Sequence, residues 1–272
     1  MNNKIALITG ASSGIGESTA QRLAQAGYTV HGTTRAASPS AQGKVDMLTL
    51  DVTSDDSAEA AIAEVLRRHG RIDLLVNNAG FGVAPAAAEE SSLEQARAIF
   101  DTNFFGMVRM TRAVVPHMRK QGSGRILNIG SVLGFLPMPY MALYSATKHA
   151  VAGYSESLDH ELRTLGIRVL VIEPGYIKTS FDANSLDPDL PLAMYGALRA
   201  ALNARVKEVL LTAQGPDVVA ETVLQAATAA HPKLRYAAGT LAARMRLLRR
   251  FAPASLVDAG IRKDLRLEAA RS

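Results

Sequence analysis

The pair of residues in this 272-residue chain with the clearest capacity for chemistry is Tyr144 and Lys148. Residues four apart on a helix lie on the same face, one turn from each other. An isolated phenol has a pKa of about 10 and exchanges protons poorly near neutrality, whereas a nearby ammonium favours the phenolate and makes the phenol a usable acid or base. The same spacing also occurs where a half-buried tyrosine neighbours a solvated lysine. The pair therefore indicates proton transfer only if the rest of the chain supplies a substrate and a reaction.

A glycine-rich turn near the start of the chain predicts a cofactor site. Residues 4–9 have the pattern of a short aliphatic strand, the next turn contains Gly10, Gly14 and Gly16, and a helical pattern follows to residue 26. Between a strand and a helix, such glycines allow a tight turn, a close approach of pyrophosphate to the backbone and close helix–strand packing. The unpaired N–H groups and positive dipole of the helix N-terminus favour an anion. We therefore expect this turn to bind phosphate groups.

The order of residues 9–16, Thr-Gly-x-x-x-Gly-x-Gly, resembles the fingerprint of the short-chain dehydrogenase/reductase family. Further elements resemble the same family in the same order: residues 77–80 (Asn-Asn-Ala-Gly), Ser131, the Tyr144/Lys148 pair and residues 174–175 (Pro-Gly). Residues 32–35 and the long C-terminal tail are similar to the branch of 17β-hydroxysteroid and retinol dehydrogenase-like enzymes.

The resemblance implies an α/β fold of the Rossmann type, with a doubly wound, seven-stranded parallel sheet and helices on both faces. The alternation of strand and helix patterns independently favours parallel strands. We expect a single domain over residues 1–272, with a small substrate lid at about 181–213 and a basic C-terminal extension at about 240–272. The expected strands are residues 4–9, 28–33, 45–50, 72–76, 125–129, 167–172 and 234–238.

The residues after the second expected strand favour NADP(H) over NAD(H). A carboxylate there would bond the ribose hydroxyls and repel a 2′-phosphate. This chain has Thr34 followed by Arg35, whose guanidinium can pair with a 2′-phosphate. The alternative is that Arg35 is an ordinary solvated charge. The resemblance implies that the other cofactor-binding residues are Gly10, Ser12, Ser13, Gly14, Ile15, Gly16, Asp51, Val52, Asn78, Ala79, Gly80, Tyr144, Lys148, Pro174, Gly175, Ile177 and Thr179.

The resemblance implies a catalytic set made of Asn103, Ser131, Tyr144 and Lys148. Ser131 follows the fifth expected strand, and catalytic groups in parallel α/β sheets lie at the carboxyl ends of strands. In the family, the tyrosine protonates a carbonyl oxygen as hydride arrives, and the serine orients that oxygen. The lysine bonds the nicotinamide ribose and lowers the pKa of the tyrosine. The asparagine disturbs its helix and holds a water that links the lysine to solvent.

The expected substrate groove has few charges. Its binding residues are expected to be Ser131, Phe135, Met138, Tyr140, Tyr144 and Phe181, and its lid wall to include Leu186, Leu190, Met194 and Tyr195. Such a wall favours a lipophilic carbonyl or alcohol, for example a sterol, a retinoid or a fatty-chain ketone. The alternative is that these side chains close the lid on itself or on a neighbouring subunit.

Composition limits the other classes of function. The net charge is +5, but from residue 231 onward ten Lys/Arg face three Asp/Glu, so the rest of the chain carries −2, which argues against nucleic-acid binding. There is no cysteine, and single, scattered histidines predict no metal site. No signal peptide or membrane-spanning run is evident, which predicts a cytoplasmic protein.

Two partner predictions and one alternative function remain. The resemblance implies a homodimer or homotetramer through the helices that contain Asn103 and Tyr144. The basic tail could cover the active-site mouth, contact a second subunit or lie on anionic lipid as a peripheral contact. The alternative to an enzyme is a catalytically silent, NADP(H)-binding regulatory protein of the same fold, which should have a broken Ser/Tyr/Lys set; here the set is intact.

Overall fold

Seven parallel strands form one sheet through the centre of the chain. The computed structural model describes residues 4–37, 40–179, 181 and 185–267. The strands follow the spatial order β3-β2-β1-β4-β5-β6-β7, and every neighbouring pair is parallel, which confirms the predicted sheet. The strands are β1 (Ile5–Ile8), β2 (Thr29–Thr34), β3 (Val45–Thr49), β4 (Leu74–Asn77), β5 (Gly124–Ile129), β6 (Ile167–Pro174) and β7 (Arg235–Ala238).

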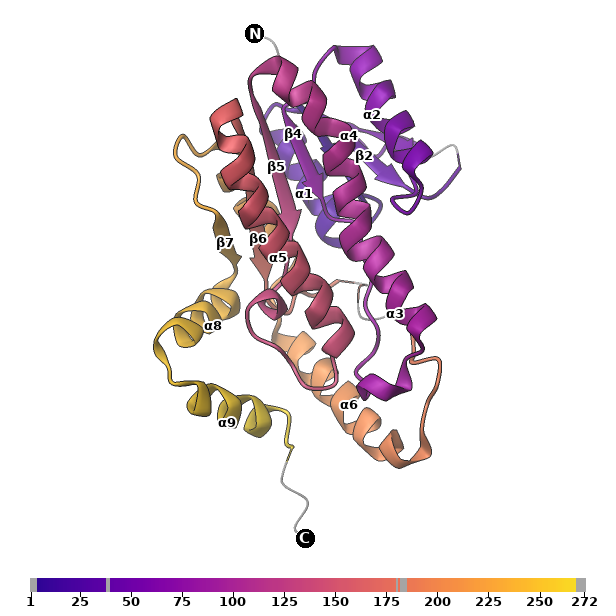
Figure 1. The fold of residues 1–272 in the computed structure, drawn as a ribbon, viewed down its shortest axis with the longest axis vertical. Coiled ribbons are helices and arrows are strands. Elements are labelled where there is room, and N and C mark those ends of the chain that lie inside the picture. Colours follow the sequence, from indigo (N-terminus) through magenta and orange to yellow (C-terminus); the bar gives the residue numbers. More distant parts are fainter. Residues whose placement is uncertain (1–3, 38–39, 180, 182–184, 268–272) are drawn as a thin grey trace.

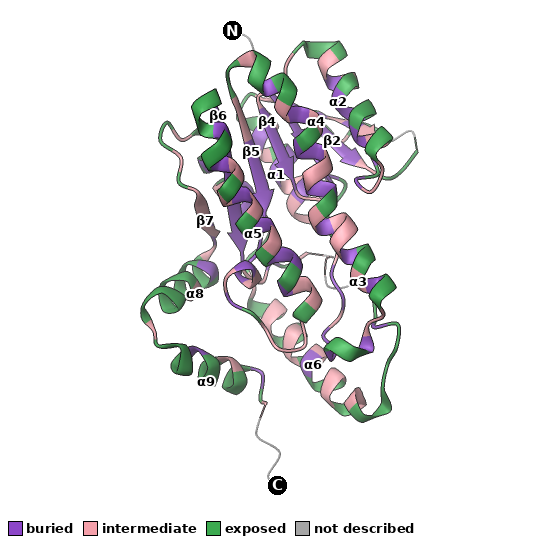
Figure 2. Ribbon diagram, viewed as in Figure 1, coloured by how far each residue is buried: buried purple, intermediate pink, exposed green. Residues whose placement is uncertain are grey.

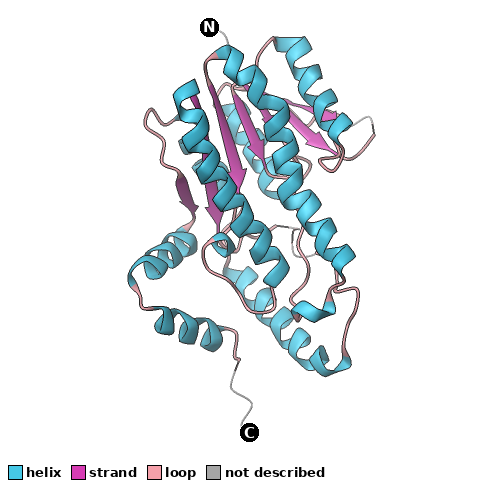
Figure 3. Ribbon diagram, viewed as in Figure 1, coloured by secondary structure: helices cyan, strands magenta, loops and turns pink. Residues whose placement is uncertain are grey.

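Helices cover both faces of the sheet (Figure 1, Figure 3). Those formed by the described residues are α1 (Gly14–Gln25), α2 (Asp55–His69), α3 (Leu93–Phe100), α4 (Gly106–Gln121), α5 (Ala142–Leu162), α6 (Gly196–Thr212), α7 (Asp217–Thr228), α8 (Thr240–Phe251) and α9 (Ala254–Asp264). The doubly wound arrangement follows from right-handed crossovers between parallel strands.

Each face of the sheet has its own apolar core. Successive side chains of a strand point to opposite faces. Ile5 and Leu7 of β1 therefore belong to one core with residues of α2, α4 and α5, while Ala6 and Ile8 belong to the other with residues of α1 and α7. Because both faces are covered, the central strands are buried along their length (Figure 2).

The predicted site residues follow the carboxyl ends of the central strands. β1 lies between β2 and β4, so the strand order reverses at this point. In doubly wound sheets the ligand crevice forms outside the carboxyl ends of the strands at such a reversal. The turns after β1, β4, β5 and β6 all open at this edge of the sheet.

The helices α6, α8 and α9 lie beyond that same edge, past the carboxyl ends of the strands (Figure 1). Most of the surface of α8 and α9 is exposed (Figure 2). Among the described residues, no helix combines the length and the apolar character that crossing a bilayer requires.

Candidate active site

The glycine turn after β1 has the shape of an anion site. Gly14 has a φ of +58°, which favours glycine, and a Cβ placed on Gly16 would lie 2.2 Å from the carbonyl oxygen of Gly10. α1 begins at Gly14, and the side chain of its N-cap residue, Ser13, makes no capping hydrogen bond among the described residues. The first N–H groups of α1 are therefore available to a phosphate.

The loop after β4 is fastened to this turn. Thr9 Oγ1 accepts hydrogen bonds from the N–H groups of Asn78 at 2.9 Å and Ala79 at 3.0 Å. The Asn78 side-chain amide donates to the carbonyls of Thr9 at 3.0 Å and Gly10 at 2.9 Å. Gly80 follows in the same loop and is exposed. The two predicted cofactor-binding segments therefore form one hydrogen-bonded unit.

Arg35 and Asp51 are exposed after β2 and β3, which are neighbouring strands. The Asp51 carboxylate accepts hydrogen bonds from the main-chain N–H and from the hydroxyl of Thr53. These two bonds, the main-chain one most, hold the pKa of Asp51 below its usual range. An ionised Asp51 can accept a hydrogen bond from an amino group. Val52 is buried and packs closely against Gly106 at the start of α4.

The segment after β6 reaches back to the glycine turn. Pro174 ends β6, and a Cβ on Gly175 would lie 3.2 Å from a side-chain atom of Leu241 in α8. Ile177 is buried, and a Cβ on Gly14 would lie 3.4 Å from Thr179. Residues 174–179 can therefore form the wall opposite the phosphate turn.

Tyr144 and Lys148 lie in the first turns of α5, as the spacing predicts. Lys148 Nζ donates to the carbonyl of Ile129 at 2.9 Å and lies 5.5 Å from the centroid of the Tyr144 ring. The lysine is 7% exposed, and burial lowers its pKa to about 8. A buried ammonium that titrates close to neutrality thus lies beside the phenol.

The short turn that begins at Ser131 packs closely against α5, the helix of Tyr144 and Lys148. It is the N-cap of the short helix η3 (Val132–Gly134), and its Oγ accepts from the N–H of Leu133 at 3.1 Å. A Cβ on Gly134 would lie 2.8 Å from the carbonyl oxygen of Lys148, so only glycine allows η3 to approach α5 this closely. The hydroxyl proton of Ser131 takes no part in the Leu133 contact, and the hydroxyl can donate to a substrate oxygen.

Asn103 lies within a π-helical turn, η2 (Asp101–Phe105), that joins α3 to α4. The residue is buried. Its Oδ1 accepts from the N–H of Phe81 at 2.9 Å, and its Nδ2 donates to the Phe81 carbonyl at 2.8 Å. The helix is disturbed at Asn103, as expected from the resemblance, but its side chain is bonded to the loop after β4.

Apolar and aromatic groups surround the candidate substrate side. The ring of Phe181 meets that of Tyr144 edge to face, with centroids 5.8 Å apart. Met138 Sδ accepts from the Tyr176 hydroxyl at 3.4 Å, and Phe135 is half-buried. Tyr140 has a φ of +64°, a strained value for a residue with a side chain, and its carbonyl accepts from the N–H of Ala86 at 2.9 Å. Such strain is concentrated at functional sites.

The predicted lid wall is exposed over much of its length. Leu186 and Leu190 are exposed, and Met194 is 77% exposed. The N–H of Leu186 donates to the carbonyl of Gly82, and the N–H of Leu190 donates to the carbonyl of Glu90. This pairing lays residues 186–190 along the chain after β4. Tyr195 is half-buried, and its hydroxyl donates a hydrogen bond to the Glu89 carboxylate.

Two anchoring residues were missed by the sequence reasoning. Glu90 is fully buried; its carboxylate accepts from the N–H groups of Ala87 and Leu192 at 2.9 Å each and forms an ion pair with Arg199 of α6. A pair separated by more than 100 residues leaves no local pattern in the sequence. These contacts hold α6 on the body of the chain. Elsewhere in the described ranges, no group of His, Asp or Glu is arranged to hold a metal ion.

Curated proteins similar to this chain include a reductase and an oxidoreductase. A 3-ketodihydrosphingosine reductase from Bacteroides thetaiotaomicron is 45% identical over 184 residues, which are 68% of either chain. An uncharacterised oxidoreductase of Bacillus subtilis, YusZ, is 34% identical over 97% of this chain and 99% of its own.

Solved structures are similar in fold over nearly the whole chain. A short-chain dehydrogenase from Streptomyces avermitilis matches with a TM-score of 0.80 at 32% identity, covering 98% of this chain and 97% of its own. A serine dehydrogenase complexed with NADP+ matches with a TM-score of 0.74 at 30% identity, over 86% of this chain and 93% of its own. A 3-ketoacyl-(acyl-carrier-protein) reductase from Brucella melitensis complexed with NADH matches with a TM-score of 0.73 at 28% identity, over 86% of this chain and 96% of its own.

A family model is the most direct comparison. The model described as short chain dehydrogenase matches residues 4–189, which include the glycine turn, the Tyr144/Lys148 pair and the segment after β6. With these matches and with the sheet order above, the chain belongs to the short-chain dehydrogenase family of oxidoreductases.

Proposed function

We propose that this chain is an NADP(H)-dependent oxidoreductase that interconverts a carbonyl and a secondary or primary alcohol on a lipophilic substrate. The observation that carries the proposal is the buried Lys148 ammonium, held by the Ile129 carbonyl and 5.5 Å from the ring centre of Tyr144. Burying a cation is costly, and buried charged groups with shifted pKa values are concentrated at functional sites. The position of this ammonium beside a phenol therefore indicates a catalytic role.

In the reductive direction, Tyr144 donates its phenolic proton to the substrate carbonyl oxygen. The Ser131 hydroxyl donates a hydrogen bond to the same oxygen and orients it. The positive charge of Lys148 stabilises the phenolate that remains. A bound NADPH would supply a hydride for the carbonyl carbon, and the proton from Tyr144 would complete the alcohol. In the oxidative direction the phenolate accepts the alcohol proton.

Asn103 would keep the proton path open in this scheme. Its side chain is bonded to Phe81, and the turn that contains it would hold a water that reaches Lys148. π-helical turns are frequent at functional sites.

The residues fit a dinucleotide. Gly14 and Gly16 would hold the pyrophosphate on the N-terminus of α1, Asp51 would accept from the adenine amino group, and Thr179 would lie over the phosphates. The bound cofactor of similar structures is NADP+ in one and NADH in another, so the preference rests on this chain's own Arg35. Its exposed guanidinium can pair with a 2′-phosphate.

The substrate class rests on the side chains around Tyr144. Phe181, Met138 and the strained Tyr140 offer apolar surface without a charge. A relative named for reducing a long-chain ketone, 3-ketodihydrosphingosine, supports a fatty-chain carbonyl. We propose residues 181–213 as the lid over this substrate, of which residues 182–184 lie outside the described part of the chain, with α6 held by Arg199.

The assembly and the location of the protein are part of the proposal. We propose that a second copy packs on the face of α4 and α5, where Phe105 is exposed beside Phe104. The cytoplasmic location stays a prediction from the sequence.

The test uses the purified wild-type chain. Fluorescence titration with NADPH and NADH is expected to give tighter binding of NADPH, and a carbonyl panel with NADPH is expected to favour long-chain ketones over small polar ones. Binding of NADPH without turnover of any carbonyl would favour the silent regulatory protein and contradict the proposal. Faster turnover of small polar carbonyls would contradict the substrate class alone.

A further inference from the structure

One side of α8 is an apolar stripe that the fold leaves uncovered. The other side attaches the helix to the sheet: Ala242 is fully buried, and Arg246 donates to the carbonyl of Arg235 at 3.1 Å. At about 100° per residue, Leu247 and Phe251 lie on the side opposite Ala242. They are 62% and 71% exposed. Neither residue is used to hold α8 on the body.

Cations border this stripe. On the same helical projection Arg244 lies between Phe251 and the exposed Leu248, and Arg250 lies on the far side of Leu247. Residues 240–266 contain seven Lys/Arg and two Asp, a net charge of +5. An exposed apolar stripe bordered by arginines is the pattern of a helix that lies in a lipid–water interface.

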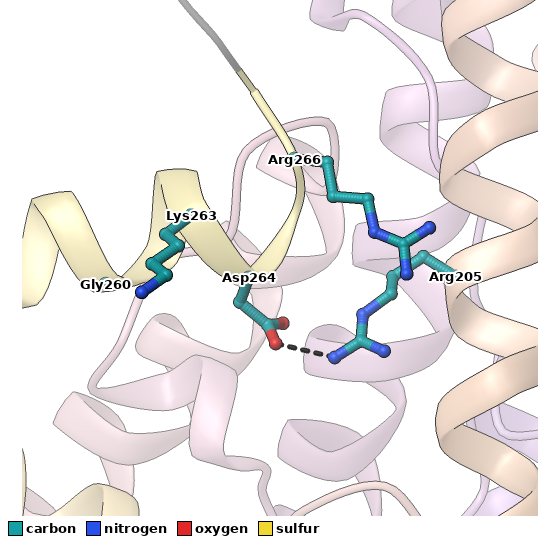
Figure 4. Close-up of a pocket in the computed structure, with 5 residues that line it drawn as sticks. All are labelled: Arg205, Gly260, Lys263, Asp264 and Arg266. Atoms are coloured by element: carbon teal, nitrogen blue, oxygen red, sulfur yellow. Dashed lines mark hydrogen bonds and ion pairs between the residues drawn. The ribbon is translucent and has the colours of Figure 1, made fainter.

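α9 extends the same kind of surface. It follows α8 after a short turn and exposes Leu256, Arg262 and Lys263. Between α9 and α6 lies a recess of about 350 Å³, lined by Arg205, Gly260, Lys263, Asp264 and Arg266. Figure 4 shows Asp264 paired with Arg205, and the two groups lie 2.7 Å apart. Arg205 and Arg266 also pair with Glu208 of α6, so the recess is a cluster of ion pairs between α6 and the end of α9.

The surface is fastened to both sides of the candidate active site. Arg249 of α8 donates to the carbonyl of Phe135, in the loop after Ser131, at 3.3 Å. Arg266 lies 3.2 Å from Glu208 of α6, the helix of the proposed lid. These contacts attach α8 and the segment after α9 to the body beside the candidate active site.

We propose that α8 and α9 form a docking surface for an anionic lipid bilayer. Leu247, Phe251 and their apolar neighbours enter the boundary between headgroups and acyl chains, and the bordering arginines contact lipid phosphates. Charge complementarity favours lipid over a second copy of the chain, because each copy of the segment 240–266 has a net charge of +5 and two such segments would repel across a two-fold axis. The docking does not depend on the proposed reaction.

The test is co-sedimentation of the purified full chain with vesicles. Vesicles of phosphatidylglycerol and phosphatidylcholine in equal parts are expected to bind the protein about tenfold or more tightly than phosphatidylcholine alone, and high salt should weaken this binding. Leu247→Ser/Phe251→Ser and Arg244→Glu/Arg250→Glu should each lower the affinity for the anionic vesicles by about tenfold or more.

A matched control is available on α3, where Leu93 and Arg97 are exposed four residues apart. Leu93→Ser/Arg97→Glu should leave vesicle binding unchanged. Circular dichroism and light scattering on each variant report the fold and the molecular mass. No binding by the wild type, equal binding to both kinds of vesicle, or equal loss in the α3 control would overturn the proposal. So would a Leu247→Ser/Phe251→Ser variant that still binds vesicles but has a smaller molecular mass, which would identify the stripe as a subunit interface.

Discussion

The side-chain amide of Asn103 forms a closed pair of hydrogen bonds with the backbone of Phe81, one accepted at 2.9 Å and one donated at 2.8 Å. Asn103 lies in the π-helical turn, and Phe81 follows the loop that is fastened to the glycine turn. The pair therefore joins the helix predicted to carry the proton path to the segment predicted to bind the cofactor.

Asn103→Ala should destabilise the protein through this pair. The variant leaves both polar groups of the Phe81 backbone without their buried partner, which costs about 1–3 kcal/mol. In a chain of this size that corresponds to a fall in Tm of about 2–4 °C for each kcal/mol. Calorimetry measures the shift. Asn203→Ala, at a half-exposed position of α6, is the control and should leave the Tm almost unchanged; an equal shift in both variants would contradict the assignment.

Lys148 should produce a break in the pH profile of reduction. Burial lowers its pKa to about 8, so the ammonium beside Tyr144 is present below that pH and is lost above it. The reductive kcat/KM, which reports groups of the free enzyme, should therefore fall as the pH rises through about 8. In Lys148→Arg the guanidinium stays charged, and the fall near 8 should disappear even though the rate is lower. A break that persists in Lys148→Arg belongs to another group.

Arg35 should decide the choice of cofactor. A charge-assisted hydrogen bond contributes about 1.5–3 kcal/mol, so Arg35→Ala should weaken NADPH binding by about tenfold or more. NADH lacks the 2′-phosphate, and its affinity should stay the same. Lys44→Ala removes an exposed cation of the loop before β3 and serves as the control. Equal losses of NADPH and NADH affinity in Arg35→Ala would show that Arg35 does not contact the 2′-phosphate.

His31 should make the protein less stable in acid. Its buried ring on β2 has Nε2 2.8 Å from Nε2 of His69 and Nδ1 3.1 Å from Asp46. Burial lowers the pKa of His31, and the charge of Asp46 only partly offsets this. Because the folded pKa lies below the unfolded value of about 6.5, the unfolded chain binds more protons as the pH falls below about 6.5. The free energy of unfolding should be fully retained above that pH and decrease below it.

Urea unfolding at neutral pH and at about pH 5.5 measures this decrease. His31→Gln, which does not titrate, should show a shallower decrease between the two pH values. His117→Gln changes an exposed histidine of α4 and should keep the wild-type slope. The same slope in all three proteins would contradict the role of His31.

The sheet could be predicted because its signals are local. The aliphatic run of β6 marks a strand buried on both faces, and the glycine spacing marks a turn with a defined backbone shape. The pairing of Tyr144 with Lys148 follows from helical geometry alone. Side-chain pattern and spacing were sufficient for these features.

Backbone partners left no such signal. The carbonyl of Ile129 that holds Lys148 and the backbone of Phe81 that holds Asn103 belong to groups that every residue has. Likewise, Glu90 has the sequence pattern of a solvated charge, yet it is buried and forms an ion pair with Arg199. The path of residues 186–190 depends on pairing with the distant segment after β4. Only the assembled fold determines these contacts.

The central claim is that the phenol of Tyr144 transfers the proton. Tyr144→Phe removes one hydroxyl and should lower kcat by about 10²-fold or more, with NADPH affinity nearly unchanged. Tyr154→Phe makes the same change ten residues further along α5, where the ring packs on Phe104, and should keep wild-type turnover. The decisive measurement is the single-turnover rate of NADPH oxidation with a long-chain ketone: a loss confined to Tyr144→Phe is the predicted result, and wild-type turnover by Tyr144→Phe would contradict the account.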